Sequence, residues 1–110
     1  MNQRVKKLWV DALRSGEYKQ GFEALRSPDD EFCCLGVLCD LYSKEKTIPW
    51  DDTNGGSYTH EGGISFPSQN VKDWADIWFV YSNILSVLVD MNDHARNSFK
   101  TIADYIEQHE

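Results

Sequence analysis

The sequence predicts an α+β fold in one domain, residues 1–110, with about five short helices around a buried central helix and one or two small β-hairpins. Three patterns carry this prediction. Apolar residues recur at helical spacing in several segments, one run of eight residues is apolar on nearly every face, and glycine- or proline-rich stretches separate these segments. The chain of 110 residues is 41% hydrophobic and 13% aromatic, which is enough for one modest core.

The first predicted helix covers residues 3–15, where the apolar side chains follow the spacing of a surface helix. They are Val5, Leu8, Trp9, Ala12 and Leu13. Asn2 precedes them as a suitable N-cap, and Gly16 follows them where a glycine commonly ends a helix.

A small hairpin is predicted over residues 17–27, with Gly21 as its turn residue. Its two short strands would carry the alternating residues Tyr18, Gln20, Ala24 and Arg26. The sequence Ser27-Pro28-Asp29-Asp30 that follows indicates a turn and the start of a helix.

The central helix is predicted over residues 31–45. It begins with the apolar run from Phe32 to Cys39 and becomes amphipathic after it, so we expect it to be buried at its start and to emerge at its end. Gly36 costs such a helix about 1 kcal/mol in propensity. We therefore expect another backbone to approach the helix closely at Gly36.

Residues 46–67 are rich in glycine and proline and are predicted to be mostly loop, with a second hairpin formed by short strands near 57–60 and 63–66. Trp50 and Tyr58 are large rings within this loop. Three helices are predicted after it, over residues 68–78, over residues 83–92 and after Ser98. Their apolar residues are Val71, Trp74, Ala75 and Trp78, then Ile84, Leu85, Leu88, Val89 and Met91, then Phe99, Ile102, Ala103 and Ile106. Ser68 and Ser98 are the expected N-caps, and residues 92–97 are the expected turn.

Charge narrows the classes of partner. The formal net charge is −7, with 18 Asp and Glu against 11 Lys and Arg. Direct binding to nucleic acid or to an anionic membrane needs a basic surface, so neither is expected. Residues 84–107 resemble two helices of a helix–turn–helix motif, but the acidic last helix argues against DNA readout. No signal peptide or membrane span is expected, and the cytoplasm is the predicted compartment.

The three cysteines, Cys33, Cys34 and Cys39, stand within the apolar run and fit no zinc motif. We expect them to be core residues, because free cysteine is among the most buried residue types. A reactive thiol near the start of the central helix is the alternative. The chain shows no glycine-rich phosphate loop or serine-hydrolase elbow, so no catalytic residue, cofactor or metal is predicted.

A nucleotide-type pocket is the most concrete site that the residues suggest. Its candidate residues are Arg14, Tyr18, Gln20, Arg26, Trp50 and Tyr58. Arginine and glutamine would hold phosphate or ribose and a ring would stack on a base, with backbone N–H groups added by helix N-termini near Phe32 and Ser68. Ordinary surface ion pairs and a structural tyrosine are the alternative interpretation.

Three segments together resemble a widespread family of small accessory proteins of tailed phages and prophages, whose function is unknown. They are residues 9–20, the string Phe-Cys-Cys-Leu-Gly-Val-Leu-Cys-Asp-Leu at 32–41, and residues 88–103. The stretch 94–97 departs from the pattern, because a glycine is expected after Asn92-Asp93.

The resemblance implies a role in modulating the host or its defences, in the host cytoplasm. The leading hypothesis is a non-enzymatic protein that sequesters a nucleotide-type immune signal, for which a homo-oligomer would help, since pockets often form between subunits. One rival is a protein–protein inhibitor that binds a host defence protein through an acidic surface. The other is an enzyme that uses Cys33 or Cys34.

Overall fold

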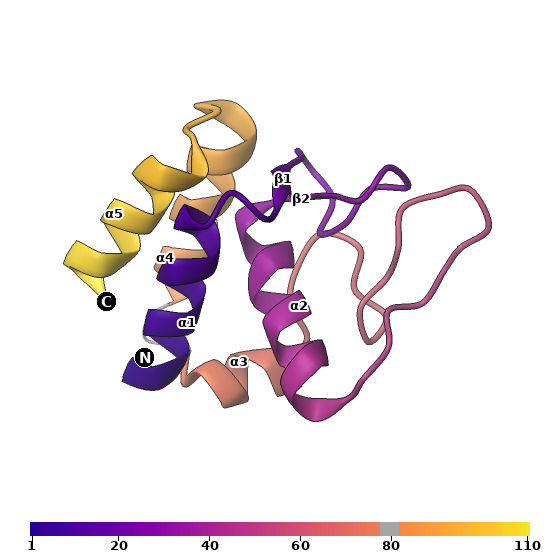
Figure 1. Ribbon diagram of the computed structural model, residues 1–110, viewed down its shortest axis with the longest axis horizontal. Coiled ribbons are helices and arrows are strands. Elements are labelled where there is room, and N and C mark those ends of the chain that lie inside the picture. Colours follow the sequence, from indigo (N-terminus) through magenta and orange to yellow (C-terminus); the bar gives the residue numbers. More distant parts are fainter. Residues whose placement is uncertain (78–81) are drawn as a thin grey trace.

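The computed structural model describes residues 1–77 and 82–110, and it confirms the α+β class (Figure 1). Five α-helices and one two-stranded sheet make up the regular structure of these residues. In chain order they are α1 (Gln3–Arg14), β1 (Lys19–Gln20), β2 (Glu31–Phe32), α2 (Cys34–Lys46), α3 (Gln69–Ala75), α4 (Ser82–Val89) and α5 (Phe99–His109). A π-helical turn, η2 (Asp90–His94), continues α4.

The predicted helix boundaries are confirmed where a local cap defines them. The Asn2 side chain accepts a hydrogen bond from the N–H of Val5, and Ser68 and Ser98 cap α3 and α5 in the same way. Gly16 follows α1 with a φ of +78°, a conformation that glycine adopts without strain. Trp78, expected at the end of the third helix, lies outside the described residues.

The predicted burial of the central helix is confirmed by α2. Its first turns, from Cys34 to Cys39, are fully buried, whereas Lys44 and Lys46 are exposed near its end. The indole N–H of Trp9 donates to the carbonyl of Cys34 over 2.9 Å and ties α1 to the start of α2. In Figure 1, α2 lies between the other helices and a set of loops.

The close approach predicted at Gly36 is also confirmed. A Cβ atom on Gly36 would lie 1.8 Å from the carbonyl oxygen of Leu25. The backbone around Leu25 therefore rests directly on α2, and only a residue without a side chain fits between them.

The predicted first hairpin is wrong. β1 pairs with β2 in parallel, with Lys19 opposite Glu31 and Gln20 opposite Phe32. Gly21 continues beside β2, and its N–H donates to the carbonyl of Phe32. Strands of two residues carry too little periodicity to reveal their partners, which explains the error.

Two neighbouring predictions also need correction. The turn at residues 27–30 leads into β2 rather than into a helix, and α2 begins only after its N-cap, Cys33. The second hairpin forms only at its turn, where His60 and Gly63 exchange two backbone hydrogen bonds, whereas Tyr58 bridges to Arg26 and Thr59 bridges to Asp51.

Two loop segments, residues 17–33 and 47–67, form the side of the molecule beyond α2, and we call them together the loop layer (Figure 1). Backbone hydrogen bonds join them, from the N–H of Leu25 to the carbonyl of Ile64 and from the N–H of Tyr58 to the carbonyl of Arg26. The loop layer therefore has a defined structure, although it contains little sheet. Within the described residues, no helix is both long and apolar enough to cross a membrane.

Candidate functional site

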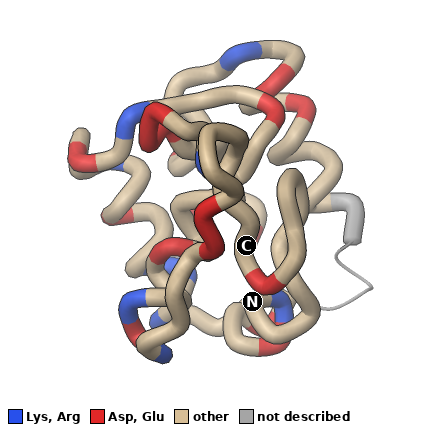
Figure 2. Tube along the Cα trace, turned by 90° about the vertical axis from the view of Figure 1, so that its right-hand side faces the viewer, with Lys and Arg blue, Asp and Glu red and all other residues tan. Residues whose placement is uncertain are grey.

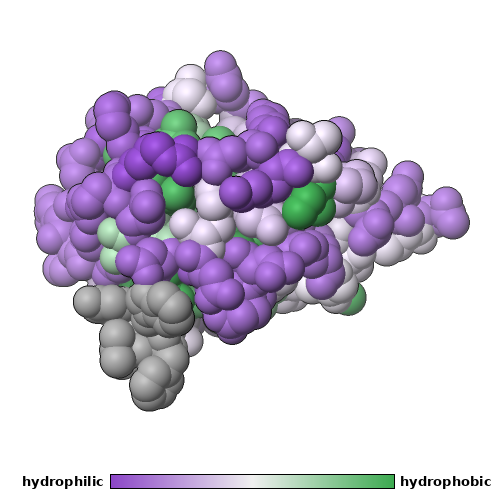
Figure 3. All heavy atoms as spheres, turned by 90° about the horizontal axis from the view of Figure 1, so that it is seen from below, coloured by the Kyte–Doolittle hydropathy of each residue, from purple (hydrophilic) through white to green (hydrophobic). Residues whose placement is uncertain are grey.

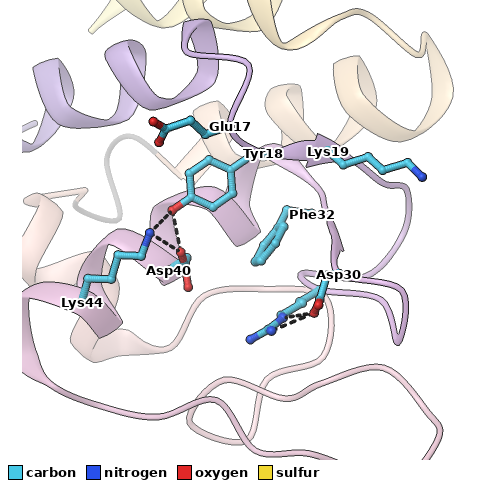
Figure 4. Close-up of a pocket in the computed structure, with 8 residues that line it drawn as sticks. Glu17, Tyr18, Lys19, Asp30, Phe32, Asp40 and Lys44 are labelled. Atoms are coloured by element: carbon cyan, nitrogen blue, oxygen red, sulfur yellow. Dashed lines mark hydrogen bonds and ion pairs between the residues drawn. The ribbon is translucent and has the colours of Figure 1, made fainter.

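A surface cleft of about 340 Å³ opens where the loop layer meets the side of α2, and we call it the Tyr18 cleft (Figure 4). Its lining residues are Glu17, Tyr18, Lys19, Arg26, Asp30, Phe32, Asp40 and Lys44. Figure 4 shows the ring of Phe32 between Tyr18 and Asp30, while Lys19 extends away from the cleft. The volume is in the range of pockets that bind small molecules.

Asp40 organises one wall of the Tyr18 cleft. Its carboxylate accepts hydrogen bonds from the Tyr18 hydroxyl over 2.5 Å and from the indole N–H of Trp50 over 3.0 Å. The ammonium group of Lys44 lies 3.3 Å from the same carboxylate. Burial and the bond to Asp40 raise the pKa of Tyr18 to about 12, so its hydroxyl stays protonated and keeps its orientation.

Arg26 organises the other wall, where its guanidinium group lies against three rings. Its Cζ atom is 4.0 Å from the centre of the Tyr58 ring and between 5.4 and 5.5 Å from those of Phe32 and Trp50. Its Nε and Nη2 atoms bind the Asp30 carboxylate. Within the part of the chain that the structure describes, Nη1 of Arg26 makes no hydrogen bond, so it remains a donor for a ligand.

The lining of the Tyr18 cleft is balanced in charge. Three cations, Lys19, Arg26 and Lys44, stand against the carboxylates of Glu17, Asp30 and Asp40. The chain as a whole has a formal charge of −7. An anionic ligand therefore meets less repulsion in this cleft than the overall charge suggests.

The structure brings together four of the six predicted site residues, Tyr18, Arg26, Trp50 and Tyr58, through the contacts of Asp40 and Arg26 described above. The other two have internal partners. The Arg14 guanidinium binds Asp104 and Glu107 of α5 over 2.6 to 3.2 Å.

The Gln20 amide donates to the side chain of Asn92 and to the carbonyl of Asn97. Arg14, Gln20 and Tyr18 do share a second hollow of about 580 Å³ between the end of α1 and the start of α5. Tyr18 thus lies between two hollows, and the polar groups proposed to hold phosphate in the second one already have partners.

Sequence reasoning missed Phe32, Asp40 and Lys44 as lining residues. Asp40 stands where the apolar run of α2 turns polar, and Lys44 follows one turn later, so both had the pattern of a solvated helix face. The predicted helix N-termini do not contribute, because no residue from the first turn of α2 or α3 lines the Tyr18 cleft.

His60 is a buried residue that packs against Trp50. Its ring is fully buried, packs edge-on against Trp50 with 4.7 Å between the ring centres, and contacts the Ser43 hydroxyl through Nε2 over 2.6 Å. Nδ1 of His60 is buried and has no hydrogen-bond partner among the residues that the structure describes. Burial lowers the pKa of His60, although the carboxylates of Glu61, Asp40 and Asp51 act in the opposite direction.

We expect stability to fall in mild acid because of His60. Since its pKa is lower in the folded state, the unfolded chain binds more protons below about pH 6.5, and folding stability decreases as the pH falls from there. Urea unfolding at roughly pH 7.5 and 5.5 should show this loss in the natural chain. His60→Gln, which cannot take up a proton, should be less stable at the higher pH but should lose less on acidification.

Equal losses in the two proteins would contradict this role of His60. The lowered pKa values of Glu61 and Glu107 do not interfere, because carboxylates titrate in more acidic solution.

The cysteines are core residues, as predicted. Cys33, Cys34 and Cys39 are free thiols and all are buried. Burial raises the pKa of Cys33 to about 11 and raises that of the other two as well. The Cys33 sulfur accepts from the N–H of Gly36 and caps α2. Among the described residues, no group of His, Cys, Asp and Glu could hold a metal ion.

The fold and the Tyr18 cleft thus define a small α+β protein with a pocket of ligand size. Over residues 1–110 the chain matches the model of a family described as a domain of unknown function, DUF8296, and it belongs to that family. No curated protein and no solved structure matches the chain.

Proposed function

We propose that this chain is a non-enzymatic accessory protein of a tailed phage, which acts in the host cytoplasm by binding a small ligand in the Tyr18 cleft. The ligand would carry a planar ring and an anionic group, most concretely a nucleotide-type immune signal. The observation that carries the proposal is that Tyr18 and Arg26 line one cleft, while Trp50 and Tyr58 pack against Arg26 outside the lining. The resemblance of residues 32–41 to phage proteins supports the biological setting.

The cleft offers both kinds of contact that such a ligand needs. Tyr18 and Phe32 present ring surface, against which a base could pack. The unpaired Nη1 of Arg26 could bind phosphate oxygens, and so could Lys44, whose ammonium has a third N–H besides those for Tyr18 and Asp40. Arg14 and Gln20 are not part of the proposed site, because their polar groups are engaged by Asp104 and Asn92.

Calorimetric titration with a panel of cyclic and ADP-ribose-type nucleotides tests the proposal. We expect heat from at least one of them at about 50 μM protein, where micromolar affinities register. Lys44→Ala removes an exposed cation of the cleft and should weaken that binding about tenfold.

Arg14→Ala is the matched control, because it removes a cation from the second hollow instead. Unchanged affinity in Arg14→Ala together with weaker binding in Lys44→Ala would assign the ligand to the Tyr18 cleft. The absence of heat with every nucleotide would count against the proposal. A loss confined to Arg14→Ala would move the site to the second hollow.

An enzyme that uses Cys33 or Cys34 has less support. A nucleophilic thiol needs a lowered pKa and access to solvent, whereas burial raises the pKa of both thiols. Neither cysteine lines the Tyr18 cleft.

A further inference from the structure

The negative charge of the chain is concentrated on the loop layer. Residues 17–33 and 47–67 contain eight Asp and Glu but only two Lys and Arg, so they carry −6 of the formal charge of −7. The rest of the chain has ten acidic and nine basic residues. Figure 2 faces this side of the molecule, where acidic positions outnumber basic ones. General solubility does not require such asymmetry, because it depends on net charge rather than on its placement.

Most carboxylates of the loop layer also form no ion pair with Lys or Arg in the described part of the chain, and we call these carboxylates unpaired. Glu31 and Asp30 bind Lys19 and Arg26, but within the described residues the other six have no Lys or Arg partner. These six are Glu17, Glu23, Asp29, Asp51, Asp52 and Glu61. On the helices, in contrast, Glu45, Asp11 and Asp104 all bind cations. The unpaired carboxylates leave a negative potential on the loop layer.

Exposed apolar side chains gather on the same loop layer. The large exposed hydrophobic residues of the described chain are Leu8, Phe22, Ile64 and Phe66, and all but Leu8 belong to the loop layer. Figure 3, which views the molecule from below, shows a mostly hydrophilic face with small separate apolar spots.

The structure holds two of these apolar stretches together. The N–H of Leu25 donates to the carbonyl of Ile64, and the Ser65 hydroxyl donates to the carbonyl of Glu23. The stretch that carries Ile64 and Phe66 therefore lies directly beside residues 22–25. Apolar side chains and unpaired carboxylates such as Glu23 thus occur on one joined surface.

We propose that the loop layer is a docking surface for a basic protein segment that also presents apolar side chains. Charge complementarity would steer the encounter, and burial of Ile64 and Phe66 would supply affinity. Nucleic acid and anionic membranes would be repelled by the same charges. A second copy of this chain is disfavoured, because two loop layers of charge −6 would meet. The proposal rests on Ile64, Phe66 and unpaired carboxylates that, apart from Glu17, do not line the Tyr18 cleft, so it does not depend on the ligand proposal.

A labelled amphipathic helical peptide of Leu and Lys, about 18 residues long, is the probe. We expect fluorescence anisotropy to show binding at about 50 mM salt and weaker binding at higher salt. Ile64→Ser/Phe66→Ser should weaken binding about tenfold or more. Leu8→Ser is the matched control, because Leu8 is exposed to 39%, similar to 42% for Phe66, but lies on α1.

A charge variant tests the other half of the proposal. Glu23→Gln/Asp29→Asn/Asp51→Asn changes three unpaired carboxylates and should weaken binding and flatten its salt dependence. Should the double serine variant fail to fold, Ile64→Ser alone is the substitute, because Ile64 is exposed to 56% and its replacement removes little core.

Three results would overturn the proposal. The first is equal binding by Leu8→Ser and Ile64→Ser/Phe66→Ser. The second is equally tight binding of a Ser and Lys peptide of the same charge, which would indicate charge attraction alone. The third is self-association through Ile64 and Phe66 in analytical ultracentrifugation, which would make a second copy the occupant. Nucleotide binding is measured separately, so either proposal can fail while the other stands.

Discussion

Gly36→Ala is expected to destabilise the protein by about 3 kcal/mol or more, the largest effect of a single methyl group that we expect in this chain. The new Cβ would lie 1.8 Å from the carbonyl oxygen of Leu25 and 2.7 Å from its carbonyl carbon. Leu25 cannot retreat easily, because its side chain is fully buried and its N–H is bonded to Ile64. The helix and the loop layer would have to separate.

The sign of this effect is informative, because the same change in an unobstructed helix would stabilise it by about 1 kcal/mol. Urea unfolding followed by circular dichroism measures the difference. Gly56→Ala is the control, since its closest contact would be the Thr53 hydroxyl, a side-chain atom that can move. A Gly36→Ala variant as stable as the natural protein would show that the loop layer does not rest on α2 as described.

The helices were predictable from the sequence because their signals are local. The Asn2, Ser68 and Ser98 caps lie within three residues of the N–H groups that they bind, so a short window contains the whole interaction. The close approach of another backbone at Gly36 was also predictable, because glycine lowers helix propensity and its presence within an apolar helix indicates tight packing.

The loop layer was not predictable to the same degree, because its contacts join residues far apart in the sequence. Arg26 pairs with Phe32 and also with Tyr58, and no short-range pattern encodes the second partner. Its strands have two residues each, too few for alternation to show a buried face. The hairpin prediction failed for this reason.

The candidate site was predicted only in part, because some of its residues have partners that are far away in the sequence. Trp50 and Tyr58 were recognisable as large rings among loop residues and Arg26 as a cation of the predicted hairpin, and the structure gathers the three. Arg14, at the end of the first predicted helix, was also a candidate cation, but its carboxylate partners are about 90 positions later in the chain, at Asp104 and Glu107. Whether an arginine is free for a ligand depends on such distant partners.

Asn92 was predicted to lie in a turn, but the structure places it in η2 as the polar centre of the core. It is almost fully buried, and its amide group donates to the carbonyl of Gly21 and to Asp93. Its carbonyl oxygen accepts from the Gln20 amide and from the backbone N–H of Cys34. One side chain thus joins η2 to the loop layer and to the first turn of α2, whose N–H groups have no partner within the helix.

We expect Asn92→Ala to reduce the free energy of unfolding by about 3 kcal/mol or more, because each buried group left unpaired costs about 1 to 3 kcal/mol. The groups left behind are the Gly21 carbonyl and the Cys34 N–H. Urea unfolding gives the total loss, and amide hydrogen exchange should show faster exchange in the first turn of α2. Asn70→Ala is the control, since Asn70 is exposed and its side chain donates to Glu61 alone among the described residues, so its loss should be below about 1 kcal/mol. If the two variants unfolded alike, Asn92 would not be the connection between η2, the loop layer and the first turn of α2 that its hydrogen bonds indicate.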